Sequence, residues 1–168
     1  IPLQIDVGFG DAITPEPVET DYVLLLDTFP APRIRVYPRE TVIAEKIQAM
    51  VFLGQLNTRM KDFYDLYTLA SESSFHGPTL RHAIEATFTR RKTTIPTSTP
   101  LCFQEEFAWS DNSRALWAGF LSRLNITDDR YSDFTSIVAM LRTFLEPPLL
   151  AAGQNKPDYS KNWSANIG

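Results

Sequence analysis

The chain has 168 residues, of which 16 are Lys or Arg and 20 are Asp or Glu, so its formal net charge is −4. This length fits one domain with a hydrophobic core, and the 43% hydrophobic and 21% charged residues exclude a disordered or fibrous chain. A single Cys excludes an internal disulfide and disfavours a zinc cluster. Hydrophobic runs reach only five residues, too short for a bilayer, and no signal-peptide pattern opens the chain, so we expect a soluble cytoplasmic protein with no membrane partner.

The first forty residues predict strands. Residues 3–9 alternate apolar and polar side chains, as a strand does, and residues 22–29 and 34–37 are rich in β-branched and aromatic residues. Residues 30–32, Pro-Ala-Pro, predict a hairpin or edge turn between the last two. Because the chain opens on what resembles the middle of a strand, we also expect it to be cut from a larger fold.

The remainder predicts helices. Apolar residues recur at helical spacing over residues 39–53, between Pro38, which favours a helix start, and Gly54, which favours a helix end. The same spacing predicts four further helices, over residues 59–69, 78–91, 111–124 and 132–144. Pro147 and Pro148 are expected to end the last of these helices. In the polar tail, Trp163 is expected to dock onto the body.

These elements predict an α+β fold, mostly helical, in which a small sheet of two or three strands precedes a helical bundle. Residues 93–100, rich in Thr, Ser and Pro, are the best internal boundary. We therefore divide the chain into residues 1–92, which hold the strands and the first helices, and residues 93–168, a helical region packed on them.

Charge is unevenly distributed along the chain. Residues 1–30 hold six acidic and no basic side chains, whereas residues 31–61 hold six basic and only two acidic ones. A mutually neutralising surface and a site that binds cations and then anions are both consistent with this pattern. The pattern alone does not separate the two.

Standard nucleotide and metal motifs are absent from the sequence. The segment at Gly8 and Gly10 lacks the third glycine of a dinucleotide loop, and His76 and His82 belong to no HExxH motif. Cys102 lies in an apolar run typical of buried packing rather than of a nucleophile.

Lys46 and two carboxylates form the strongest candidate site. Asp62 and Asp65 are three residues apart in a predicted helix, so both carboxylates lie on nearly one face. Two antiparallel helices joined by a short connection would bring Lys46 near that face. The group is either a buried structural ion pair or a phosphate-binding Lys oriented by an Asp.

Three ordered segments, residues 3–11, 37–46 and 59–66, closely resemble the nucleotidyltransferase family of AbiEii/AbiGii-type toxins. These are the toxin halves of bacterial abortive-infection and toxin–antitoxin systems. The resemblance implies a DNA-polymerase-β-like nucleotidyltransferase core followed by a helical C-terminal region. It also implies transfer of NMP from an NTP to an acceptor, with RNA such as tRNA the leading candidate.

The resemblance implies roles for individual residues as well. Asp6 matches the third metal-binding carboxylate of the family, and Lys46 matches its nucleotide-contacting Lys. Asp65, together with Asp62 and Arg59, matches the family helix that positions this Lys. We therefore expect Asp6, Lys46 and Asp65 to be catalytic, and Lys46, Arg59 and Asp62 to bind nucleotide. Asp6 is the expected metal ligand, and Mg²⁺ is the expected cofactor of the full-length family.

The sequence departs from the family pattern because it contains neither a Gly-Ser motif nor an Asp-x-Asp pair. We therefore expect the C-terminal portion of such an enzyme, inactive by itself. One alternative is a non-catalytic remnant that acts as a binding or dimerising module through an exposed sheet edge. Another is an unrelated helical fold in which the pair of Lys46 and Asp65 is purely structural. The expected partners are an NTP, an RNA acceptor, a cognate antitoxin and a second copy of the chain.

Overall fold

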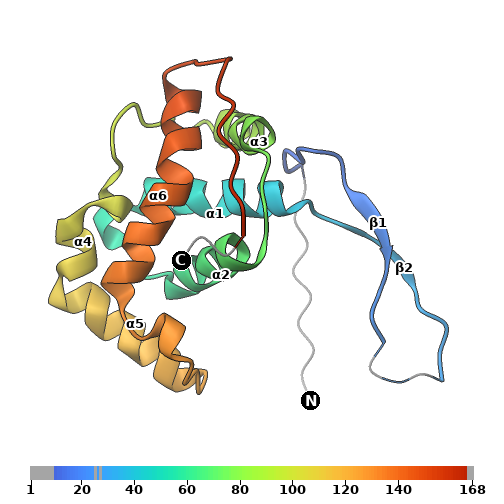
Figure 1. Ribbon diagram of the computed structural model, residues 1–168, viewed down its shortest axis with the longest axis horizontal. Coiled ribbons are helices and arrows are strands. Elements are labelled where there is room, and N and C mark those ends of the chain that lie inside the picture. The colour runs from blue at the N-terminus through green and yellow to red at the C-terminus, as the bar shows by residue number, and fades with distance from the viewer. Residues whose placement is uncertain (1–9, 25, 27, 166–168) are drawn as a thin grey trace.

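The computed structural model describes residues 10–24, 26 and 28–165 (Figure 1). Their elements, in chain order, are β1 (Val18–Asp21), β2 (Arg33–Val36), α1 (Arg39–Leu53), η1 (Gly54–Leu56), α2 (Met60–Glu72), α3 (Gly77–Arg90), η2 (Leu101–Phe103), α4 (Glu105–Trp109), α5 (Asp111–Arg123), η3 (Asp129–Tyr131) and α6 (Phe134–Gly153), where η marks a 3₁₀ turn. The predicted α+β, mostly helical fold class is confirmed. The strand predicted over residues 3–9 lies outside the described residues.

The two strands form an antiparallel hairpin that projects from the helical body (Figure 1). Its first strand is not where the sequence predicts it, because the described residues of the segment 22–29 form no strand and instead connect β1 to β2. The more polar β1 takes that place. Glu19 and Asp21 of β1 lie opposite Arg35 and Arg33 of β2, and Glu19 forms a diagonal ion pair with Arg33 at 3.3 Å. Opposite charges thus face each other across the ladder.

Helix α1 begins and ends where its sequence predicts. Pro38 precedes it with an extended backbone, and Gly54 follows it with φ of 53° and ψ of −125°, a positive-φ conformation that glycine adopts without steric cost. Helix α4 is absent from the prediction because its five residues are too few to display a helical period.

Helix α6 continues through Pro147 and Pro148, so the prediction that these residues end it is wrong. Each proline removes a backbone donor from the helix, which disfavours its continuation. Beyond the prolines, however, Leu149, Ala151 and Ala152 are buried in the core, and this burial offsets the lost hydrogen bonds.

By length and composition alone, α6 could cross a membrane, which we did not expect from the short hydrophobic runs. Half of its apolar window is nevertheless buried against the other helices, as in the core helix of a globular protein. Helix α6 packs mainly on α3 and α2. The helix thus has a packing role that accounts for its hydrophobicity.

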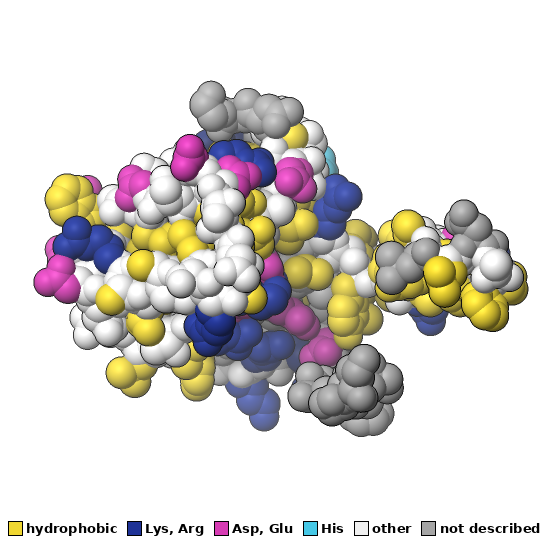
Figure 2. Space-filling view, turned by 90° about the horizontal axis from the view of Figure 1, so that it is seen from below, with side chains coloured by type: hydrophobic (Ala, Val, Ile, Leu, Met, Phe, Trp, Pro, Cys, Tyr) yellow, Lys and Arg dark blue, Asp and Glu magenta, His cyan; other side chains and the backbone are white. Residues whose placement is uncertain are grey.

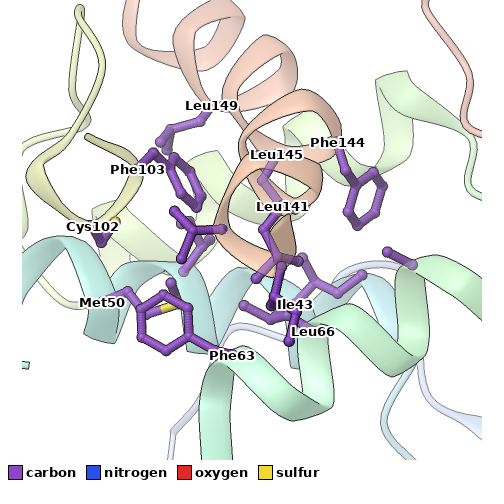
Figure 3. Close-up of a cluster of buried hydrophobic side chains, with 14 of the residues drawn as sticks. Ile43, Met50, Phe63, Leu66, Cys102, Phe103, Leu141, Phe144, Leu145 and Leu149 are labelled. Carbon is purple, nitrogen blue, oxygen red and sulfur yellow. The ribbon is translucent and has the colours of Figure 1, made fainter. Parts of the chain in front are cut away.

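One hydrophobic core runs from α1 through α6 (Figure 3). The ring of Phe63 on α2 stacks on Phe107 of α4 at 5.7 Å and meets the ring of Phe134 of α6 edge-on at 5.2 Å. Cys102 belongs to the same core, where burial raises the pKa of its thiol to about 12. Cys102 is therefore a packing residue and not a nucleophile, as its apolar neighbours in sequence predict.

The tail docks onto the body through Trp163, as predicted. Phe75 and Trp163 form an antiparallel bridge with backbone hydrogen bonds of 2.8 and 3.0 Å. The indole Nε1 donates to the carbonyl of Ala70 at 2.9 Å, and the ring packs 4.7 Å from that of Phe144. The chain end is thereby tied to α2 and α6.

Candidate functional site

Lys46 of α1 reaches two carboxylates of α2. Its Nζ lies 2.9 Å from Oδ1 of Asp62 and 2.7 Å from Oδ2 of Asp65. The three side chains are largely withdrawn from solvent, with exposed fractions of 18%, 4% and 22% in that order. The structure thus brings together the Lys and both Asp that the sequence singles out, while their roles stay predictions.

Two more cations complete this group, which we call the Lys46 cluster: Lys46, Arg59, Lys61, Asp62 and Asp65. Arg59 Nε lies 2.7 Å from Oδ2 of Asp62, and Lys61 Nζ lies 2.6 Å from Oδ2 of Asp65. The contact between Arg59 Nε and Asp62 Oδ2 is electrostatic, because this buried carboxylate oxygen accepts no aligned hydrogen bond. Three cations and two carboxylates leave the cluster with a net charge of +1.

Local structure sets the positions of these side chains. The backbone N–H of Arg59 donates to Oδ1 of Asn57 at 2.9 Å, which fixes the turn that starts α2. The spacings of Arg59 to Asp62 and Lys61 to Asp65 are i,i+3 and i,i+4, so each cation meets its carboxylate on the helix surface. The fully buried Phe63 anchors the same turns of α2 in the core.

Lys61 is the member of the cluster to which we assigned no role from the sequence. Its side chain is 70% exposed and pairs with Asp65. A Lys and an Asp four residues apart on one helix are recognisable in the sequence as a potential ion pair. The sequence does not distinguish such a pair from an ordinary surface ion pair. Its place beside Lys46 depends on the tertiary contact between α1 and α2.

Pairing controls the ionisation of the cluster. Burial alone would lower the pKa of Lys46, but hydrogen bonds from its ammonium to Asp65 and Asp62 outweigh burial and hold the pKa above its ordinary value. Burial would raise the pKa of Asp65, but its bonds from Lys46 and Lys61 hold that pKa below its ordinary value. Both groups are therefore charged at neutral pH.

These ion pairs make stability depend on pH. Because the folded pKa of Asp65 is lowered, its stabilisation is present above the unfolded pKa of about 3.9 and is lost as pH falls through the folded value. We expect Asp65→Asn to lower the free energy of unfolding by about 1 to 2 kcal/mol at neutral pH and by progressively less in acid. Urea denaturation across this range measures the difference.

The matched control for Asp65→Asn is Asp158→Asn, since Asp158 is exposed in the tail. Its effect should stay within about 0.5 kcal/mol at every pH. A destabilisation by Asp65→Asn that does not change between neutral and acid pH would contradict the ion-pair explanation.

The carboxylates of the Lys46 cluster do not fit Mg²⁺. Asp62 and Asp65 already face three cations, so a further cation would be repelled. Among the described residues, no three His, Cys, Asp or Glu side chains gather to hold a metal ion. Asp6, the predicted metal ligand, lies outside the described residues. The cluster therefore suits an anion.

The family to which the chain belongs is settled by comparison with known families. The model of the family described as nucleotidyl transferase AbiEii toxin, type IV TA system, matches residues 1–141. The chain belongs to the AbiEii family. No curated protein and no solved structure gives a significant match.

The AbiEii match confirms the resemblance carried by the three sequence segments. It ends within α6, so it includes α1, α2 and every residue of the Lys46 cluster. The AbiEii family is described as one of nucleotidyl transferase toxins of a toxin–antitoxin system.

Proposed function

We propose that the Lys46 cluster is the nucleotide-binding part of an AbiEii-type nucleotidyltransferase, which transfers NMP from an NTP to an acceptor. The observation that carries this proposal is the hydrogen bonding of Lys46. A Lys ammonium has three donors, and Asp62 and Asp65 take two of them, so one is left for a phosphate oxygen. The net charge of +1 favours the same ligand.

In this proposal Asp62 and Asp65 are positioning residues. They hold the Lys46 ammonium in one place, so little side-chain entropy remains to be lost when a phosphate binds. Arg59 keeps guanidinium donors free beyond its contact with Asp62 and can reach a second phosphate oxygen. The chain's own residues thus bind and orient the triphosphate.

Family membership supports the wider proposals. We propose RNA, with tRNA first, as the acceptor, and a bacterial cytoplasm and a role in abortive infection as the setting. A cognate antitoxin is the proposed counterpart, and Mg²⁺ the proposed cofactor of the full-length family. Asp6 remains the proposed metal ligand. Because the sequence contains no Asp-x-Asp pair, we expect this 168-residue chain to bind nucleotide without transferring it.

The test is calorimetric titration of the chain with ATP, GTP, CTP and UTP, together with transfer from α-labelled NTP. We expect at least one NTP to bind and inorganic triphosphate to compete, because the phosphates carry the recognition. Absence of binding by all four NTPs would overturn the proposal. Transfer of label by this chain alone would overturn the expectation of inactivity.

A second candidate function, dimerisation through the sheet, is favoured by the hairpin arm. The ladder places Val18 opposite Val36, and exposed apolar residues continue along the arm at Tyr22, Val23 and Leu26. In Figure 2 the arm, at the right, carries a group of hydrophobic side chains. A two-stranded hairpin is marginally stable alone in water, so a second copy that covers this arm would stabilise it.

We expect the chain to self-associate, with Val23→Asp shifting it to monomer, because a buried carboxylate without a partner opposes association. Sedimentation velocity measures the distribution. Leu56→Asp, on the helical body and equally exposed, is the control and should leave it unchanged. A parent chain that stays monomeric at high concentration would contradict the dimer.

A further inference from the structure

A groove lies between the start of α2 and the end of α5. Its volume is about 380 Å³, within the range of small-molecule sites. Part of its wall is apolar and comes from α5 and the residue that follows it, namely Leu116, Phe120 and Leu124. The groove is therefore large enough for one planar group the size of a nucleobase, with an apolar surface to receive it.

Cations border the same groove. Arg59 and Lys61 come from α2 and Arg123 from the last turn of α5, and none of the lining residues is acidic. This composition contrasts with the net charge of −4 of the whole chain. Figure 2, seen from the side on which α2 and α5 lie, shows Lys and Arg side chains gathered on this face. The groove is thus a local site of positive charge.

The groove continues the Lys46 cluster, because Arg59 and Lys61 belong to both. Arg123 does not belong to the cluster and forms no ion pair with the described residues. Compensation of the α5 dipole would explain Arg123 by itself. It would not explain why two cations of another helix border the same groove.

We propose that this groove binds the acceptor as a single-stranded nucleic acid, and this inference rests on the proposed nucleotidyl transfer. Arg59 and Lys61 contact the phosphate on one side of a nucleotide, and Arg123 contacts the phosphate on the other. The base lies against Leu116 and Leu124. Sequence-tolerant single-strand binding combines cations that follow the backbone with aromatic side chains against which bases stack. The groove supplies the cations, and Phe120 is the aromatic residue of its apolar wall.

A strand suits the groove better than a second free nucleotide does. The cations lie on two helices, α2 and α5, whereas the phosphates of a free nucleotide form one compact group. A strand carries a phosphate on both sides of each base and satisfies both sets of cations at once. The shared residues Arg59 and Lys61 then bring the acceptor next to the NTP.

The experiment is fluorescence anisotropy of a short fluorescein-labelled RNA oligonucleotide, titrated with the full 168-residue chain at several salt concentrations. We expect salt-dependent binding that Arg123→Gln weakens about fivefold, since each lost phosphate contact also reduces the salt slope by about 0.7 for single strands. Leu124→Asp should weaken binding as well, because it places a carboxylate in the groove. Arg123 and Leu124 are exposed, so both variants should fold.

The matched control is Arg114→Gln. Arg114 lies on the same helix, is similarly exposed and pairs with Asp111, outside the groove. It should leave the affinity and the salt slope unchanged. Equal losses in Arg114→Gln and Arg123→Gln, or no loss in either, would overturn the groove as the site. Tighter binding of a duplex of the same sequence would overturn a single-stranded ligand.

Parallel titration with NTP separates this inference from the function on which it rests. A chain that binds NTP but no oligonucleotide contradicts the groove and leaves the Lys46 cluster as the nucleotide site. A chain that binds the oligonucleotide through Arg123 but no NTP contradicts the proposed function and shows a nucleic-acid-binding module instead.

Discussion

Lys46→Ala is expected to weaken NTP binding about 100-fold, which corresponds to about 2.7 kcal/mol. The substitution removes the donor that is free for a phosphate oxygen and takes the net charge of the Lys46 cluster from +1 to zero. A charge-assisted hydrogen bond contributes about 1.5 to 3 kcal/mol, enough for this loss. Calorimetric titration with the tightest-binding NTP measures it.

The same substitution should lower the free energy of unfolding by about 2 to 3 kcal/mol, because Asp62 remains buried with only Arg59 beside it. Titrations must therefore be run where urea denaturation shows both proteins folded. Lys156→Ala, an exposed Lys of the tail, is the control and should change neither quantity. If Lys46→Ala loses stability but binds NTP as the parent does, the cluster is purely structural.

Lys46→Arg separates charge from geometry at this position. The guanidinium keeps the positive charge but spreads its donors over a planar fork, which does not reproduce two contacts at 2.9 and 2.7 Å from one nitrogen. We expect NTP affinity between those of the parent and Lys46→Ala. Full affinity in Lys46→Arg would mean that charge alone carries the recognition.

Sequence predicts the contact of Lys46 with Asp62 and Asp65 because its signals are short-range. Helix α1 is bounded by Pro38 and Gly54, and helix α2 carries its two carboxylates three residues apart. Once both helices are predicted, the short connection between them requires them to pack side by side, which places Lys46 near the two carboxylates. The resemblance of the three sequence segments to the family then suggests a nucleotide-binding role for a contact that helical periodicity already predicts.

Sequence does not predict features that depend on distant residues. The strand β1 forms in place of the more apolar residues 22–29 by pairing with β2, and α6 passes through its prolines because of the core that it meets. The groove beside α2 depends on Arg123, which is more than sixty residues from Arg59. No local pattern distinguishes Arg123 from a cation at any helix end.

Phe63→Ala is expected to lower the free energy of unfolding by about 3 to 5 kcal/mol. The ring is fully buried and packs on Phe107 and Phe134, so alanine leaves a cavity between α2, α4 and α6. A change of this size should lower the Tm by roughly 6 to 20 °C. Urea and thermal denaturation measure it.

Two substitutions bracket the effect of Phe63→Ala. Phe63→Leu keeps much of the apolar volume and should cost less than half as much. Phe52→Ala removes a ring that is 72% exposed on α1 and should change stability within about 0.5 kcal/mol. Similar losses for Phe63→Ala and Phe52→Ala would contradict the core described between α2, α4 and α6.

Phe63→Ala also tests what holds the Lys46 cluster in place, since Phe63 follows Asp62 on α2. The cluster is tied by its own ion pairs, from Lys46 to both carboxylates and from Arg59 and Lys61 along α2. We therefore expect folded Phe63→Ala to keep its NTP affinity within about threefold of the parent. A larger loss would mean that the core beneath α2, rather than the ion pairs, sets the position of Lys46.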